Sequence, residues 1–306
     1  MRTSIVVPTF NRRDRLPAVV ESLIAQPADE IVVVVDGSRD GSIEYLHGRA
    51  SEDRRLRPVW TENGGEGRAR QRGAGVASGE LLLFLDDDVE PLPGLVEGHR
   101  RHHVARGGLV VLGYMPTAGT GFASRLYSQE YERRCASYQR EPQLVLRHFW
   151  AGNFSMRRSD ALSVGLFSDR FTERYHPDRE FGLRCLDAGL EGVFDRAPAA
   201  RHHHERSLAA FRRDARSQGA GRRQLAHLHP AAAGGDGERQ FLDGLPPLLP
   251  ALVAAARRPR AYAIASSALH AAVRAAGAAG ASAIELAAAR TLRRLEQLRG
   301  WRVGSV

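Results

Sequence analysis

The stretch ELLLFLDDDVEP at residues 80–91 says most about the fold of this 306-residue chain. Five of its first six residues are apolar, as in a strand buried on both faces, and three consecutive aspartates, Asp86–Asp88, follow them. Adjacent carboxylates repel one another without a counter-ion. Alternate residues of an extended segment point the same way, so Asp86 and Asp88 can address one divalent metal ion. The alternative is an acidic loop exposed to solvent.

The N-terminal third of the chain alternates between two kinds of segment. Apolar residues at helical spacing predict helices over 14–25 and 67–77, and short apolar runs predict strands over 4–8, 30–35, 57–61 and 80–85. This alternation indicates an α/β fold with a mostly parallel, Rossmann-like sheet that helices cover on both faces. Ligands bind beyond the carboxyl ends of such strands. Polar clusters follow three of the predicted strands, at 9–11, 36–38 and 86–88.

The rest of the chain changes character beyond residue 230. Before that point we expect a strand over 109–113, a helix over 124–138, a return to the sheet over 149–157 and a helix over 179–188. Beyond it the composition predicts three parts: a main domain over 1–230, a Gly/Ala/Asp-rich linker over 231–244 and an Ala- and Arg-rich helical tail over 245–306.

The charge of the chain is carried by arginine alone. All 44 basic residues are Arg, so chemistry that requires a lysine amine, such as a Schiff base or a P-loop, is excluded. From residue 251 onward nine Arg stand against two Glu, which places +7 of the net +9 in the tail. The sequence pI of 10.4 therefore does not indicate a nucleic-acid partner. Two cysteines exclude a disulfide framework and a Cys-rich zinc site, and are typical of buried thiols in the cytoplasm.

Two further features could bind a nucleotide. Asp36 ends a predicted strand, where its carboxylate can accept hydrogen bonds from a base or ribose, although a simple Asp-Gly turn explains it equally well. The Gly-rich turn at 63–67 precedes a helix that carries Arg68 and Arg70. Helix N-termini attract phosphate, and Arg binds phosphate through two parallel hydrogen bonds.

Five motifs in order resemble glycosyltransferase family 2. They are VPTFNR at 7–12, VVDGSRDGS at 34–42, NGGEGRARQRG at 63–73, SGELLLFLDDDVEP at 78–91 and WAGNFSMRRSD at 150–160. The resemblance covers about residues 1–230. It implies the GT-A fold and an inverting enzyme that uses a nucleotide-diphospho-sugar, and it makes 1–230 the catalytic domain.

The resemblance also implies roles for the matching residues. The nucleotide and donor sugar would be bound by Pro8, Thr9, Asn11, Asp36, Arg70, Asp86 and Asp87. Asp88 would hold a divalent metal ion, Mg or Mn. The acceptor would lie beside Trp150, Gly152 and Asn153.

The catalytic base is expected in HPDREFGLR at 176–184. Pro177 stands where the family usually has Glu, which is a departure from the pattern. Asp178 matches the family's base and Glu180 its second acid, and an inverting transfer needs one carboxylate near the acceptor hydroxyl. Asp178 could also be a helix N-cap, and the two roles are compatible.

Histidines occur in two clusters. The resemblance places a metal-facing His near 202–204, and we favour His202 and His204 because they share a side of an extended segment. A solvated His-rich loop is the alternative. His99, His102 and His103 are expected on the exposed face of a helix.

The activity implied is transfer of one sugar to an acceptor hydroxyl, in cell-envelope glycan or glycoconjugate synthesis. The Gln-x-x-Arg-Trp motif of processive synthases is absent. Two alternatives stay open: an NDP-sugar nucleotidyltransferase and a non-catalytic nucleotide-sugar-binding module.

The tail has two interpretations. Helices over 245–256 and 261–294 could pack on the catalytic domain or form a homodimer. They could instead lie on an anionic membrane, close to a glycan or lipid-linked acceptor. The protein would then be cytoplasmic, with peripheral membrane contact.

Overall fold

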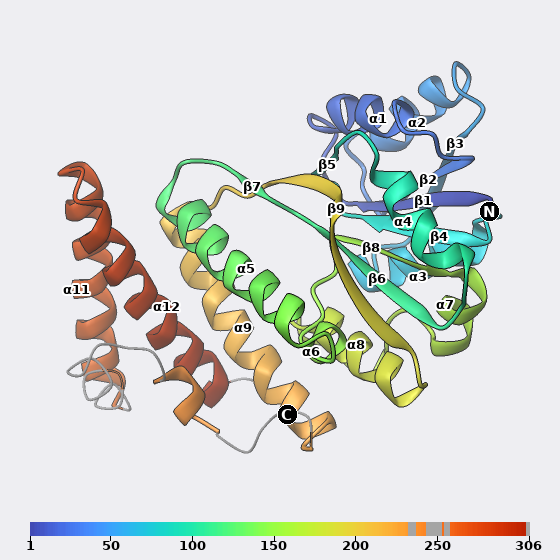
Figure 1. Ribbon diagram of the computed structural model, residues 1–306. Coiled ribbons are helices and arrows are strands. Elements are labelled where there is room, and N and C mark those ends of the chain that lie inside the picture. The colour runs from blue at the N-terminus through green and yellow to red at the C-terminus, as the bar shows by residue number, and fades with distance from the viewer. Residues whose placement is uncertain (232–236, 243–252, 254–257, 304–306) are drawn as a thin grey trace. The chain divides into compact units, whose positions relative to one another are not determined.

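A computed structural model describes residues 1–231, 237–242, 253 and 258–303, and it divides into two compact units (Figure 1). The first unit contains residues 1–118, 132–169 and 178–203. The second contains residues 119–131, 170–177 and 204–306. The predicted linker and the predicted helix over 245–256 lie largely outside the described residues, so those boundaries stay predictions.

The first unit is built on a sheet with strand order β3-β2-β1-β4-β8-β6-β9-β5, and β7 pairs with β9. The strands β1–β4 pair in parallel, whereas β8 runs antiparallel to both β4 and β6, and β5 antiparallel to β9. This confirms the predicted mostly parallel α/β sheet. The strands are β1 Thr3–Thr9, β2 Glu30–Asp36, β3 Leu56–Thr61, β4 Leu81–Leu85, β5 Val89–Pro91, β6 Leu109–Tyr114, β7 Thr117–Ala118, β8 Asn153–Arg157 and β9 Glu191–His203.

Helices cover the sheet where right-handed crossovers place them. The chain steps from β1 to β2 to β3 in one direction, so α1 and α2 lie on one side, and it returns to β4 through α3 on the other (Figure 1). Sequence analysis predicted α1, α3, α5 and α8 and placed the histidines of α4 on a helix, but it gave no helix over α2. The helices are α1 Leu16–Ile24, α2 Ser42–Ala50, α3 Glu66–Val76, α4 Leu95–Val104, α5 Phe122–Arg140, α6 Leu144–Arg147, α7 Arg158–Val164 and α8 Pro177–Asp187.

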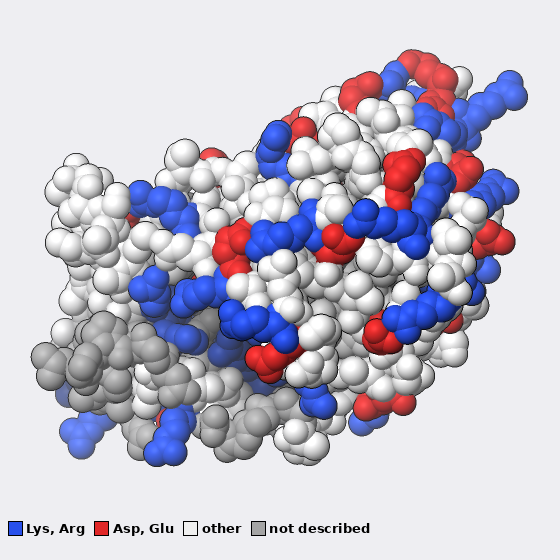
Figure 2. Space-filling model, viewed as in Figure 1, with Lys and Arg blue, Asp and Glu red and all other residues white. Residues whose placement is uncertain are grey.

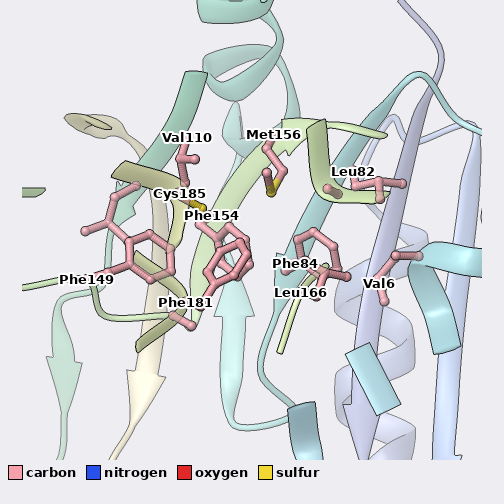
Figure 3. Packing of buried hydrophobic residues seen from close by; sticks show 14 of the residues in the cluster. Val6, Leu82, Phe84, Val110, Phe149, Phe154, Met156, Leu166, Phe181 and Cys185 are labelled. Carbon is pink, nitrogen blue, oxygen red and sulfur yellow. The ribbon is translucent and has the colours of Figure 1, made fainter. Parts of the chain in front are cut away.

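An aromatic cluster fixes α8 to the sheet (Figure 3). Phe84 of β4 stacks on Phe154 of β8 with ring centroids 4.7 Å apart, and Phe181 of α8 lies 6.0 Å from Phe154. Gly182 brings α8 close, because a Cβ at this position would collide with the Leu146 carbonyl. The first turn of α8, which carries Asp178, is therefore held at a fixed place relative to β4.

The second unit consists largely of helices: α9 Leu208–Leu228, the 3-10 turn Arg239–Phe241, α11 Pro259–Ala278 and α12 Ser282–Val303. The tail segment predicted over 261–294 is two helices, separated where Gly280 adopts a φ of +68°. α12 crosses α9 closely, since a Cβ at Gly219 or Gly300 would collide with the backbone of the other helix. No described helix is both long and apolar enough to span a bilayer. The membrane and homodimer interpretations stay predictions.

Charged side chains of both signs lie on the face that Figure 2 shows. Acidic and basic side chains are interspersed over the first unit, in keeping with the near-neutral charge of residues 1–250. Oppositely charged side chains also pair inside the second unit, where one carboxylate is completely buried.

That buried carboxylate belongs to Glu296 of α12. It accepts hydrogen bonds from Arg212 Nε at 2.8 Å, Arg216 Nη2 at 2.7 Å, Tyr262 Oη at 2.5 Å and Ser266 Oγ at 3.0 Å. These hydrogen bonds lower the pKa of Glu296 even though burial alone would raise it. The partners come from α9 and α11, so one carboxylate joins all three helices.

Replacing Glu296 by Ala should reduce the free energy of unfolding by roughly 3 kcal/mol, because two arginines and two hydroxyls lose their common acceptor. Both arginines are partly exposed, which keeps the cost at the low end. The lowered pKa means that the stabilisation is present above the unfolded-state value of 4.5 and is lost as pH falls below it. Urea denaturation at pH 7 and pH 4 would measure both effects. Glu205→Ala, on an exposed residue, is the control, and an equal effect of the two changes would contradict the assignment.

Candidate active site

The predicted donor residues meet at one edge of the sheet. Thr9 ends β1, Asp36 ends β2 and Asp86 directly follows β4. These strands are parallel neighbours, so their carboxyl ends lie side by side. Pro8 is buried within β1, and Asn11 lies just beyond it with a φ of +51°.

Each aspartate of the triplet has a different partner. Asp87 accepts a hydrogen bond from Thr9 Oγ1 at 2.8 Å and lies 3.9 Å from Arg12 Nε. Asp88 Oδ1 lies 3.6 Å from His202 Nε2 on β9. Asp86 pairs with the guanidinium of Arg70. The carboxylates are thus separated by partners from three other elements.

Burial dominates the electrostatics of the triplet. Desolvation raises the pKa of Asp87 to about 6, against the opposing effect of its Thr9 hydrogen bond. Desolvation also raises the pKa of Asp86 well above its usual value, although the charge of Arg70 opposes it. A site that raises carboxylate pKa values in this way favours a bound cation.

Arg70 is the counter-charge that the protein itself supplies. Its guanidinium is 2% exposed and pairs with both Asp86 and Glu66, and it lies 5.5 Å from the centroid of the Phe167 ring. Glu66 was not among the predicted residues. Its spacing of four residues from Arg70 on a helix was the available signal.

Asp36 holds the Gly-rich turn that precedes α3. Its two carboxylate oxygens accept hydrogen bonds from the amides of Gly64 at 2.8 Å and Gly65 at 2.9 Å. Gly37 has a φ of +74°, and a Cβ there would lie 2.6 Å from the amide nitrogen of Asn63. Asp36 and Gly37 therefore shape the turn, and the predicted nucleotide contact of Asp36 stays a prediction.

The predicted base lies at the same site. Asp178 accepts hydrogen bonds from the amides of Arg179 at 2.8 Å and Ala151 at 3.3 Å. Desolvation raises its pKa to about 6, against the effect of these two bonds. The next residue, Gly152, accepts a hydrogen bond from the amide of Asp86 at 3.2 Å. The backbone of residues 151–152 therefore contacts both the base and the acidic triplet.

The predicted acceptor side has little room for added atoms around Gly152. A Cβ at Gly152 would lie 3.1 Å from Asp86 Oδ2 and 2.8 Å from the sulfur of Met115. Trp150 is partly exposed just before it.

Two predicted site residues have structural partners instead. Glu180 is 3% exposed, and both its oxygens accept from Arg184 Nε at 3.0 Å, so it forms an ion pair within α8. Asn153 is completely buried, and its amide donates to the Pro198 carbonyl at 2.9 Å. The predicted catalytic role of Glu180 and the predicted acceptor contact of Asn153 do not fit this burial.

The two histidine clusters also differ from expectation. His202 approaches Asp88, whereas His204 belongs to the second unit and stacks on Tyr127 at 4.3 Å between ring centroids. The expectation of an exposed face on α4 was wrong: His99 and His103 are completely buried. Their spacing of four residues, in register with Leu95, was the overlooked signal of a buried face.

Asp88 and His202 form the best donor pair for a metal ion. Carboxylate oxygen and neutral imidazole nitrogen are both ligands that Mn²⁺ accepts. Among the described residues, no group of three or more His, Cys, Asp or Glu side chains could hold an ion.

Comparison with known proteins identifies the family. A sequence model described as "Glycosyl transferase family 2" matches residues 4–164. The chain belongs to glycosyl transferase family 2. Its curated relatives include the uncharacterized glycosyltransferase YibD of Escherichia coli, 36% identical over 98 residues, which are 31% of this chain and 28% of the relative. Another is an undecaprenyl-phosphate 4-deoxy-4-formamido-L-arabinose transferase of Yersinia pestis, 34% identical over 119 residues, 37% of this chain and 36% of the relative. The chain thus aligns with about a third of the length of these relatives.

Solved structures of glycosyltransferases share the GT-A fold of this chain. The mannosyltransferase PcManGT of Pyrobaculum calidifontis, in complex with GDP-Man and Mn²⁺, gives a TM-score of 0.56 at 16% identity, covering 96% of this chain and 85% of that one. The glucosyl-3-phosphoglycerate synthase of Mycobacterium tuberculosis, with Mn²⁺, UDP and glucosyl-3-phosphoglycerate, gives 0.52 at 21% identity, covering 76% and 80%. The predicted fold is confirmed.

The close approach at Gly37 can be separated from its backbone conformation. Gly41 has a φ of +83° with nothing within 4 Å of an added Cβ, so Gly41→Ala should cost only the strain of the left-handed region, about 1 kcal/mol. Gly37→Ala should cost at least about 1 kcal/mol more, because its Cβ would press on Asn63. Urea denaturation of both variants would measure the difference. Equal costs would mean that the Asn63 turn yields freely.

Proposed function

We propose that this chain transfers a glycosyl group from a nucleotide-diphospho-sugar to an acceptor hydroxyl with inversion, one sugar at a time, in a metal-dependent reaction. The proposal rests on one observation: a donor pair for a cation and a carboxylate with a raised pKa both lie at the same edge of the sheet. Asp88 and His202 offer a donor pair for a cation, and Asp178 offers a carboxylate with a raised pKa. Residues 151–152 link the two.

The donor side would bind the nucleotide-sugar at the ends of β1, β2 and β4. Asp88 and His202 would hold Mn²⁺ or Mg²⁺, and a bound ion would neutralise charge on the leaving nucleoside diphosphate. The printed descriptions of the two similar structures name Mn²⁺ together with GDP-Man or UDP, which supports this assignment. The charge of Arg70 opposes the rise in the pKa of Asp86, and its guanidinium would hold this carboxylate in place beside the donor.

Asp178 would act as the base. With a pKa of about 6 it is mostly deprotonated at pH 7, yet it is a stronger base than an exposed aspartate. The amides of Ala151 and Arg179 fix its two oxygens, so the carboxylate can take the proton of an acceptor hydroxyl in one orientation. One such carboxylate is sufficient for an inverting transfer, in which the hydroxyl attacks the anomeric carbon opposite the leaving group.

Release of nucleoside diphosphate from a panel of UDP-, GDP- and dTDP-sugars, with Mn²⁺ or Mg²⁺, tests the function. We expect release with one donor class and its loss on chelation of the metal.

Asp178→Asn should lower kcat by about 10²- to 10⁴-fold. The rate should rise with pH through about 6, because Asp178 accepts a proton only when ionised. Glu80→Gln, on an exposed residue at the opposite end of β4 from Asp86, is the control.

Other outcomes identify the alternatives. A nucleotidyltransferase would instead consume a sugar phosphate and a nucleoside triphosphate and release pyrophosphate. A binding module would bind a nucleotide-sugar without releasing the diphosphate. Full activity of Asp178→Asn would remove Asp178 as the base.

We further propose that the acceptor carries a phosphate group. Arg179 follows the base in α8, and its Nε donates to the Arg147 carbonyl at 3.0 Å, which fixes the guanidinium. Burial, and then the charge of Arg134 on α5, lower the pKa of Arg179. Two guanidinium groups therefore act on this position against the single carboxylate of Asp178, and the excess positive charge favours an anion. The printed names of two similar proteins contain undecaprenyl-phosphate and phosphoglycerate, which supports the proposal.

Paired acceptors in which both members keep a hydroxyl test this proposal: 3-phosphoglycerate against glycerate, and a sugar phosphate against the free sugar. We expect transfer only to phosphorylated members. Arg134→Gln should raise the KM for the phosphorylated acceptor about tenfold, because one charge-assisted hydrogen bond is lost, and it should leave the KM for the donor unchanged. Arg140→Gln, on an exposed residue of the same helix, is the control. Equal transfer to both members of each pair would contradict the proposal.

A further inference from the structure

A chain of buried polar side chains lies behind the site, between α4 and β8. His103 Nε2 lies 2.9 Å from Ser155 Oγ, and Ser155 Oγ lies 2.8 Å from His99 Nδ1. His99 Nε2 lies 2.8 Å from Asn153 Oδ1. All four residues are completely buried. Buried polar groups of this kind persist only when their hydrogen bonds are mutually consistent.

The proton positions in this hydrogen-bonded chain follow from Asn153, the residue at one end of it. The Asn153 amide nitrogen faces two backbone carbonyls, those of Pro198 at 2.9 Å and Tyr114 at 3.3 Å. Carbonyls only accept, so this atom is the donor and the other, Oδ1, is an acceptor. His99 Nε2 must therefore carry a hydrogen.

The same logic fixes the rest of the chain. Neutral His99 has a bare Nδ1, which accepts the single hydroxyl hydrogen of Ser155. Ser155 has no second hydrogen, so His103 must donate to it from Nε2. Every donor then points the same way, from His103 through Ser155 and His99 to Asn153.

The neighbours of the two histidines keep both rings neutral. Desolvation and the neighbouring imidazoles of His103 and His102 lower the pKa of His99 to about 3, while its hydrogen bond to Asn153 and the charge of Asp195 oppose them. Desolvation, His102 and Arg157 lower the pKa of His103 to about 4, while Asp160 opposes them. His102 is held apart from the chain, with its Nε2 2.7 Å from Asp195.

Asn153, the last residue of the hydrogen-bonded chain, is connected to the site through the backbone. Asn153 follows directly on residues 151–152, which contact Asp178 and Asp86. Its amide bonds to the Tyr114 and Pro198 carbonyls at the register shift between β6 and β9. Gly113 leaves room there, because a Cβ would collide with both the Asn153 amide and the Pro198 carbonyl. Asn153 is thus the point where three strands and the 151–152 turn are tied together.

We propose that His103, Ser155 and His99 form a one-way hydrogen-bonded chain that locks Asn153, and that these four are positioning residues which hold the Ala151 amide against Asp178. The role in catalysis rests on the proposed function. The direction of the hydrogen bonds from His103 to Asn153 does not depend on the proposed function, and it can be measured on its own.

Nitrogen chemical shifts of the imidazole rings, recorded by NMR on the full-length ¹⁵N-histidine-labelled chain, test the direction. We expect His99 and His103 as neutral Nε2–H tautomers that do not titrate between pH 5 and 8. A hydrogen on Nδ1 of either ring, or titration near pH 6.5, would overturn the chain whether or not the protein is a transferase.

Ser155→Ala tests the positioning role, because it removes the middle link with almost no change in volume. Ser4→Ala is the matched control: Ser4 is also completely buried and bonded, to Glu30 Oε2 at 2.5 Å, but it lies at the opposite end of the sheet from the site. We expect Ser155→Ala to lower kcat at least tenfold and leave the donor KM unchanged, while Ser4→Ala does neither.

The pH profile distinguishes positioning from general destabilisation. Burial raises the pKa of Asp178, and the charge of Glu66 adds to this rise. The amides of Arg179 and Ala151 and the charge of Arg70 lower it. Tyr138 on α5 and the Arg179 side chain on α8 also face this carboxylate. Weakening the Ala151 bond should move the acidic limb of kcat above pH 6. A Ser155→Ala enzyme as stable as the Ser4→Ala enzyme, with unchanged kcat and limb, would overturn the positioning role. Absence of all transfer in the native chain would instead count against the proposed function.

Discussion

Three adjacent carboxylates at the end of β4 are the constraint on which the site depends. In water their repulsion would be screened, but here burial raises the pKa values of Asp86 and Asp87. The chain meets the cost by giving each carboxylate its own partner: Arg70 from α3, Thr9 from β1 and His202 from β9. Because the partners lie far apart in sequence, the site forms only when the whole sheet has formed.

The absence of lysine makes this arrangement more specific. A lysine ammonium is a flexible point charge, whereas a guanidinium is planar and can contact two carboxylates at once. Arg70 uses this property between Glu66 and Asp86, whereas Arg212 and Arg216 both pair with the one carboxylate of Glu296. The same type of contact therefore stabilises the site and the second unit.

The sequence predicts what depends on local pattern. Continuous apolar runs located β1, β2 and β4, and the polar residues after them proved to be neighbours, because parallel strands align their carboxyl ends. It does not predict pairing over distance. Asn153 has a residue type typical of a site, but its amide nitrogen donates to the distant Pro198 carbonyl. The pair of Glu180 and Arg184, by contrast, lies four residues apart on one helix and was a readable local signal. His99 and His103 have a polar residue type on a buried face, and only Ser155, some fifty residues away, explains it.

The front and the back of the site use opposite electrostatics. The front concentrates charge, with aspartates and Arg70 at the ends of the strands. The back is polar but neutral, because His99 and His103 stay uncharged at any pH at which Asp178 is ionised. A charged group behind Asn153 would act on Asp178 and the triplet through a poorly screening interior and shift their pKa values. A neutral hydrogen-bonded chain can fix the geometry of residues 151–152 without altering the charge at the front of the site. An ion pair at the same place would shift the pKa values of the aspartates. This explains why imidazole and hydroxyl groups lie there.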